Sequence, residues 1–363
     1  MNNNKQPLGI HNKVKSTSLL AKQAFKELHK YQQGEKALLK TGRPYIDKHL
    51  GGALPGSLIL IGAPSGVGKT HESQNILKNI LDTNINKNAN NYVTLEFMLE
   101  MKFLNLIMRD THQLLHKKKS EILSKPFNEM EKKIVENYYE TLKDGRRFIV
   151  EESIDTTEFF EICDKFCEEN KDKDAIIILV DHLLLVSAKN RGEDPLKTIS
   201  QDTNILSKKY SNVYFIYLSQ LNRGVYGDIK EKSNNMIPDV SHIYGSSHFE
   251  FLSQFAVIMF NPFKLGIEQY MSVNINRYSN LSEFYGETNL KGDRVSFSTL
   301  GNMFFHTVKV RDSDDIHDNL YIERMNISEE HLKKMKMDIE KPDNFYIEDS
   351  DFEFETDSED TPF

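Results

Sequence analysis

The sequence has few of the features that mark secreted or membrane-bound proteins. Its 363 residues include only two cysteines, Cys163 and Cys167, four positions apart in a helical pattern. Because no second pair of ligands accompanies them, we expect core or surface thiols rather than a metal site. No apolar run approaches the roughly 18 residues of a membrane helix, and the first residues contain no apolar signal segment. We therefore expect a soluble protein of a reducing cytoplasm, with no membrane partner.

A general excess of positive charge is also missing. The net charge is −8, but residues 343–363 hold nine acids and no Lys or Arg, so the remaining chain has a net charge of +1. The acidity is therefore largely a property of the C-terminal segment. A nearly neutral body can still bind DNA when a few basic groups line a shared channel.

Apolar runs and helical patterns alternate through the middle of the chain. Runs that are typical of buried parallel strands occur at 58–61, 92–95, 147–150, 175–180 and 213–218. Between them, helical patterns occupy 71–81, 98–117, 127–143, 156–169 and 195–210. Such alternation predicts an α/β fold, a mainly parallel twisted sheet with helices on both faces.

The flanking regions differ from this core. Residues 1–40 are expected to form a helical linker, with an amphipathic stretch at 18–39, and the main domain is expected to span 41–340. Within it, residues 262–300 are irregular, aromatic and polar, which suggests an insertion. A late β-hairpin is expected from 292–298 and 303–310, and a disordered acidic tail from 341–363.

The most informative motif follows the first predicted strand. It matches a phosphate-binding loop, except that Ala63 replaces the first glycine of the pattern. Glycines let backbone N–H groups turn around an anion, and the next helix directs its positive end to the same place. Lys69 is expected to reach the β- and γ-phosphates, and the Thr70 hydroxyl to ligate Mg²⁺. The expected nucleotide-binding residues are Ala63, Pro64, Ser65, Gly66, Val67, Gly68, Lys69, Thr70 and His71.

Three later strands supply polar residues at their ends. Asp181 ends the run that begins at Ile176 and is expected to complete the metal site. Glu96 is the favoured base for water because it ends the run at 92–95, and Glu100, expected on the next helix, is its rival. Gln220 follows a further strand and is a candidate sensor of the γ-phosphate.

Together these motifs resemble the RecA-like motor domain of DnaB-type replicative helicases. The resemblance covers roughly residues 41–312, and it rests on the segments 41–56, 94–97, 179–186, 199–201 and 218–223. It implies a homo-hexameric ring that uses ATP and Mg²⁺ to move 5′→3′ along single-stranded DNA and unwind duplex. The chain departs from the family because only about 40 residues precede the motor, where the family has a collar domain. A motor without a collar domain suggests that the protein comes from a phage or mobile element and is located in the host cytoplasm.

The resemblance implies further site residues. The family's DNA loop is similar to residues 241–250, which makes Gly245, Ser246, Ser247 and also Arg223 candidates for DNA contact. Lys309 and Arg311 match a family Lys-x-Arg pair that enters the neighbouring subunit's site. Alternatively, these two are exposed basic residues that protect an edge strand from pairing.

The tail and the overall function leave alternatives open. The terminal Pro362 and Phe363 after an acidic run resemble the tip of bacterial single-stranded-DNA-binding proteins, so the tail either docks on primase or other replisome proteins or keeps the chain soluble. The function we expect is a ring-forming helicase motor. Alternatives are a recombinase-like or clock-type ATPase that assembles without unwinding, and a nucleotide-dependent adaptor without motor activity.

Overall fold

A computed structural model describes residues 14–222, 224–225, 237–274, 288–291, 294–311 and 320–325. They fall into two compact units, the first comprising residues up to Phe260 together with Phe304–Tyr321, and the second Asn261–Met303 with residues from Ile322 onward. The expected insertion at about 262–300 falls in the second unit, whereas the expected boundary at 340 and the acidic tail lie outside the described residues.

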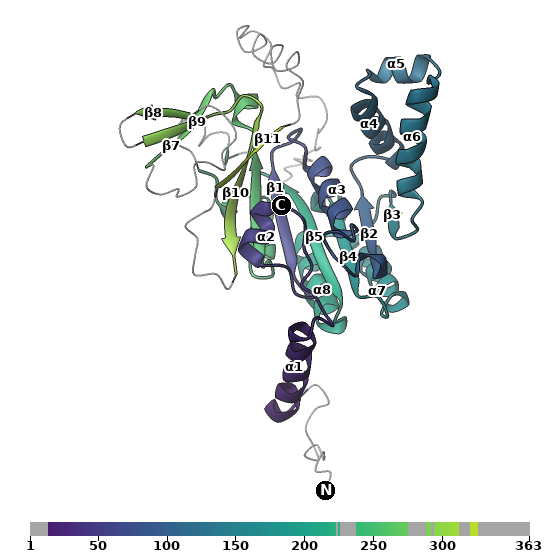
Figure 1. The fold of residues 1–363 in the computed structure, drawn as a ribbon. Coiled ribbons are helices and arrows are strands. Elements are labelled where there is room, and N and C mark those ends of the chain that lie inside the picture. Colours follow the sequence, from purple (N-terminus) through teal and green to yellow (C-terminus); the bar gives the residue numbers. More distant parts are fainter. Residues whose placement is uncertain are drawn as a thin grey trace, which may run out of the picture. The chain divides into compact units, whose positions relative to one another are not determined.

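An eight-stranded sheet dominates the fold (Figure 1), in the order β11-β10-β6-β1-β5-β4-β2-β3. The pairs from β6 through β3 are parallel, as the alternating pattern predicts, and β10 runs antiparallel to β6. The strands are β1 Leu58–Ala63, β2 Tyr92–Met98, β3 Arg147–Val150, β4 Ala175–Asp181, β5 Val213–Gln220, β6 Phe255–Phe260, β10 Asn302–Val310 and β11 Leu320–Arg324.

The central strands form the core of the protein. Every residue of β1, β2, β4 and β6 is buried, which explains why their sequences are largely apolar rather than alternating; Thr94 and Glu96 of β2 are buried polar exceptions. Cys163 and Cys167 are buried thiols on α7, in agreement with the sequence. No group of three or more His, Cys, Asp or Glu side chains among the described residues is arranged to hold a metal ion.

Helices precede and connect the parallel strands. Among the described residues they are α1 Thr17–Gln32, α2 Pro44–Leu50, α3 Lys69–Ile80, α4 Phe103–Leu115, α5 Lys119–Ser124, α6 Glu129–Leu142, α7 Thr156–Glu169, α8 Pro195–Lys209 and α10 Ser246–Phe249. Short 3₁₀ turns occupy Ala89–Asn91 (η1), Leu183–Leu185 (η2), Val240–His242 (η4) and Pro262–Leu265 (η5). In the described part of the chain, no helix has the length and apolar character needed to cross a membrane.

Local sequence fixes several helix boundaries. The side chain of Asp155 accepts hydrogen bonds from the backbone of α7, and Asp194 caps α8 in the same way, with Pro195 at the first helical position.

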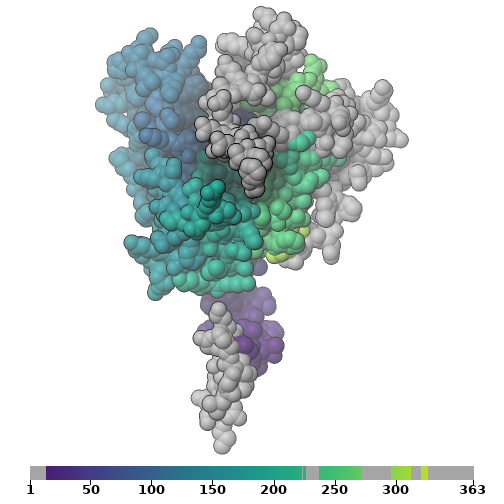
Figure 2. Space-filling model, turned by 180° about the vertical axis from the view of Figure 1, so that it is seen from behind, coloured from purple at the N-terminus to yellow at the C-terminus, as the bar shows by residue number. Residues whose placement is uncertain are grey.

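Seen from behind, α4 to α6 (blue) form a continuous surface (Figure 2). The sequence predicts α4 and α6, but it gives no signal for the short α5 between them.

The late antiparallel strands differ from expectation in their pairing. Strands occupy both expected ranges, but β9 (Arg294–Ser298) pairs with β7 (Gln269–Asn274) and β8 (Thr288–Lys291) rather than with β10. β10 instead extends the main sheet beside β6. A late antiparallel pair of neighbouring strands is therefore present, but β8 and β9 form it, and the two expected ranges do not pair with each other. The region expected to be irregular contains this three-stranded sheet.

Candidate functional site

The segment between β1 and α3 folds as an anion-binding loop. Gly66 and Gly68 have φ angles of 70° and 112°, a backbone conformation that side chains with a Cβ rarely adopt. Lys69 begins a helix of 12 residues directly after this turn. The backbone N–H groups of the first helical turn and the positive end of the helix dipole therefore face the loop. This is the arrangement that binds phosphate groups.

Lys69 lies inside this loop rather than in solvent. Its side chain is 6% exposed, and Nζ donates hydrogen bonds to the carbonyl oxygens of Ala63 at 3.3 Å and Pro64 at 3.4 Å. Burial lowers the pKa of Lys69, and the negative charges of Glu100 and Asp181 oppose that shift. A buried ammonium group beside helix-end N–H groups is suited to an anion of multiple charge.

Asp181 and Thr70 place two oxygen atoms where a divalent cation could bind. Both residues are buried, and Asp181 Oδ1 has no hydrogen-bond partner among the described residues. Burial raises the pKa of Asp181 to about 6, while a hydrogen bond from Thr70 acts in the opposite direction. A buried carboxylate oxygen without a partner next to a hydroxyl group fits Mg²⁺, which prefers oxygen ligands.

Glu100, rather than Glu96, reaches this site. Strand β2 continues to Met98, which pairs with Asp181, and the Leu99 N–H donates a 2.9 Å hydrogen bond to the Asp181 carbonyl. Glu100 therefore follows immediately at the carboxyl end of the sheet. Its side chain is 44% exposed, so it is accessible to water.

Glu96 lies within the sheet and is fully engaged there. The expectation that it ends its strand is wrong, because the strand runs two residues further. Arg147 Nε donates to Glu96 Oε1 at 2.7 Å and Arg147 Nη2 to Oε2 at 2.6 Å. Thr94 Oγ1 donates to Oε1 at 2.8 Å, and Gln74 Nε2 to Oε2 at 3.3 Å. A completely buried carboxylate with four such bonds is not positioned to activate water.

His182 lies close to both Gln220 and Glu100. Gln220 ends β5 and pairs with Ala63 at the start of the loop. The His182 Nε2 atom is 3.3 Å from Gln220 Nε2 and 3.9 Å from the Glu100 carboxylate. Burial lowers the pKa of His182, and Glu100 opposes this shift. Nothing in the sequence marks His182 as a site residue except its position next to Asp181.

Lys309 and Arg311 lie at the opposite end of the sheet. Lys309 pairs with Ala256, and the Arg311 N–H donates to the carbonyl of Gln254 at 2.8 Å. The Gln254 N–H in turn donates to the carbonyl of Leu58, the first residue of β1. The phosphate loop begins five residues later, roughly 16 Å along the strand at about 3.3 Å per residue. The pair is therefore remote from the phosphate loop of its own chain.

The expected DNA loop is attached to the end of β5. The Asn222 N–H donates to the His242 carbonyl at 2.8 Å, and Leu221 forms a β-bridge with Ile243. Gly245 has a φ of 73° and precedes α10, which begins at Ser246. Ser247 is exposed. Arg223, the fourth expected contact, lies outside the described residues.

The fold and these residues define a P-loop nucleotide site on a RecA-like sheet, and comparisons identify the family. The family model described as the DnaB-like helicase C-terminal domain matches residues 39–271, so the chain belongs to that family. No curated protein sequence matches.

Solved structures share the fold. One of them, titled as an ATPase domain, has a TM-score of 0.60 and 16% identity, with 85% of this chain and 94% of that chain covered. Another is titled as the structure of a DnaB-like replicative helicase and its interactions with primase. It has a TM-score of 0.56 and 16% identity, and the match covers 85% of this chain and 64% of that chain.

Proposed function

We propose that the protein is an ATP-dependent replicative DNA helicase that moves along single-stranded DNA. The observation that carries the proposal is the convergence of Lys69, Asp181, Glu100 and Gln220 at one end of the sheet, in a member of the DnaB-like family. A triphosphate in the loop would contact Lys69 and the start of α3. Thr70 and Asp181 would hold Mg²⁺, which would neutralise charge on the phosphate oxygens.

In this proposal Glu100 replaces Glu96 as the base that orients and deprotonates water. Its carboxylate is accessible and lies beside Lys69 and Asp181, whereas the carboxylate of Glu96 is occupied by Arg147. Gln220 acts as the sensor of the γ-phosphate. Since the loop from Ser241 onward is hydrogen-bonded to the end of β5, a displacement of Gln220 is transmitted to Gly245, Ser246 and Ser247. These residues are proposed to contact DNA phosphates.

Lys309 and Arg311 are proposed to complete the site of a neighbouring subunit. Their position at the far end of the sheet from their own phosphate loop supports a role in trans rather than in cis. Arg311 is exposed, as a residue that reaches another chain must be. An arginine that approaches the γ-phosphate in trans stabilises transition-state charge and makes hydrolysis depend on assembly.

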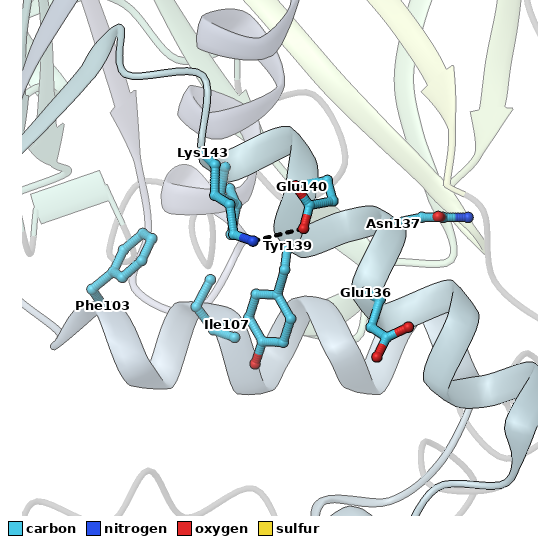
Figure 3. Close-up of a pocket in the computed structure, with 8 residues that line it drawn as sticks. Phe103, Ile107, Glu136, Asn137, Tyr139, Glu140 and Lys143 are labelled. Atoms are coloured by element: carbon cyan, nitrogen blue, oxygen red, sulfur yellow. Dashed lines mark hydrogen bonds and ion pairs between the residues drawn. The ribbon is translucent and has the colours of Figure 1, made fainter.

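The surfaces of α1 and of the α4–α6 segment support assembly into a homo-hexamer. Helix α1 has no buried residue, and its apolar Phe25 and Leu28 are 66% and 51% exposed. Between α4 and α6 lies a cavity of about 650 Å³, lined by Phe103, Ile107 and Tyr139. Figure 3 shows these side chains with the acidic Glu136 and Glu140 nearby. Glu140 is paired with Lys143 at 2.6 Å and Glu136 with Lys132 at 3.9 Å, so the apolar lining is what α1 can match. We propose that the apolar face of α1 of one subunit fills this groove of the next.

The test combines ATP hydrolysis with strand displacement. A helicase hydrolyses ATP faster with single-stranded DNA and displaces a strand from a forked duplex. Stimulated hydrolysis with filaments but without displacement would favour a recombinase-like ATPase, and nucleotide binding without turnover would favour an adaptor. The proposal that primase or other replisome proteins bind the acidic tail concerns residues outside the described part of the chain. It is tested separately, by removing residues 361–363 and measuring that binding.

A further inference from the structure

Tyr244 presents an aromatic ring at the surface of the proposed DNA loop. Its side chain is 51% exposed, although the preceding Ile243 is only 1% exposed and His242 is also buried. The apolar part of this loop is therefore packed into the protein, while the tyrosine points outward. A single exposed aromatic ring is common on protein surfaces. Tyr244 differs in the hydrogen bonds that fix its backbone.

The backbone of Tyr244 is fixed by both residues at the end of β5. Its N–H donates to the Gln220 carbonyl at 2.8 Å, and its carbonyl accepts a 2.8 Å hydrogen bond from Ser219 Oγ. Both backbone polar groups of this residue thus depend on the strand that carries the γ-phosphate sensor. A displacement of the backbone at the end of β5 therefore moves the Tyr244 backbone or breaks one of these two bonds.

Gly245, the residue after Tyr244, determines the direction of the backbone beyond the loop. Gly245 has a φ of 73°, and a Cβ at this position would lie 2.5 Å from Leu196 Cδ1. The positive φ favours glycine here, and a larger residue would also displace the end of the Leu196 side chain. The loop is therefore tightly built around Tyr244, and its ring is presented from a rigid support.

We propose that Tyr244 is a stacking platform for a base of single-stranded DNA, moved directly by Gln220. This inference rests on the proposed function and adds to it a contact with bases rather than phosphates. Aromatic rings stack on any base, so the contact tolerates all sequences, as a translocating motor requires. Phosphate contacts of Gly245, Ser246 and Ser247 would position the strand beside the ring.

The experiment compares binding of a normal oligonucleotide with that of the same oligonucleotide carrying abasic sites. Wild-type protein, with a non-hydrolysable ATP analogue, should prefer the normal strand. Tyr244→Ala should lose roughly tenfold or more in affinity for the normal strand, and its preference over the abasic strand should fall. Tyr244→Phe should behave as wild type, and Tyr244→Leu, which keeps apolar bulk without an aromatic face, should behave as the alanine variant.

Two controls make the result specific. Phe148→Ala removes an aromatic ring of similar exposure, 44%, from the edge strand β3, and it should leave DNA binding unchanged. The slope of affinity against salt concentration should stay the same in Tyr244→Ala, because stacking releases no phosphate counterions.

The inference is overturned if Tyr244→Ala keeps the wild-type ratio between normal and abasic strands. It is also overturned if that variant loses assembly by sedimentation while its monomers remain folded, since the ring would then be a protein contact. Failure of wild-type protein to bind any single-stranded DNA would be a different result, because it contradicts the proposed function itself.

Discussion

The guanidinium group of Arg147 holds both carboxylate oxygens of Glu96, at 2.7 and 2.6 Å. This pair joins β3 to β2, and Gln74 connects it to α3, the helix that follows the phosphate loop. Its geometry is the two-pronged one that arginine and carboxylate adopt when both are held in place. We infer that Glu96 stabilises the packing of β2, β3 and α3 around the site. Glu100, whose carboxylate is exposed, is the glutamate that faces the site.

We predict that Glu100→Gln abolishes ATP hydrolysis while nucleotide binding is retained. Loss of a general base typically lowers turnover by about 10²- to 10⁴-fold, and glutamine preserves the shape of the side chain. Steady-state hydrolysis and binding of a fluorescent nucleotide would measure the two effects. Hydrolysis at wild-type rate by this variant would exclude Glu100 as the base.

Glu96→Ala is expected to act on stability instead. Removing this carboxylate leaves Arg147, whose side chain is 17% exposed, without its buried partner. Breaking a buried pair from one side typically costs roughly 3 to 5 kcal/mol, and we expect the lower end here. Denaturant unfolding with the matched variant Glu168→Ala, which removes one member of an exposed surface pair, gives the comparison. Equal stability of the two variants would contradict the structural role.

Mixing two inactive variants tests the shared site. Lys69→Ala should prevent nucleotide binding, whereas Arg311→Ala should bind nucleotide normally but not hydrolyse it. Mixed rings place some intact phosphate loops next to intact arginines, so part of the activity should return. Turnover measured across mixing ratios would reveal this. A mixture that stays inactive, although both variants assemble together, argues for sites confined to single chains.

Assembly should depend on the apolar face of α1. Phe25→Asp places a charge on a side chain that is 66% exposed in the single chain, so folding should be unaffected. If α1 packs in the groove of a neighbour, the charge would be buried there and the complex should dissociate. Analytical ultracentrifugation with Phe25→Leu as the conservative control would measure this. Unchanged complexes in Phe25→Asp would remove α1 from the interface.

Stability should decrease below about pH 6 because of His306. This residue is fully buried on β10, and burial lowers its pKa to about 3 from a usual value of 6.5. The unfolded chain therefore binds the proton more readily between these values, and stability falls as pH falls through this range. At pH 5 the loss is about 2 kcal/mol. Urea unfolding at pH 7 and 5 should show a smaller difference in His306→Phe than in wild type.

The phosphate loop and the parallel strands could be predicted from sequence because local physics determines them. Buried parallel strands are mainly apolar, and the loop needs glycines at Gly66 and Gly68. Glu96 does not lie at its expected strand end because Phe97 and Met98 extend β2 by two residues. The partner of Glu96 is Arg147, 51 residues away, and no local pattern reports such a contact. The pairing of β10 with β6 likewise joins segments that are distant in sequence, so no local pattern predicts it.

The most direct test is displacement of a labelled strand from a forked duplex by the purified protein with ATP and Mg²⁺. We expect displacement that requires a single-stranded tail and ATP, and that is lost in Lys69→Ala. ATP turnover that is stimulated by single-stranded DNA, without any strand displaced at any protein concentration, would contradict the assignment as a helicase.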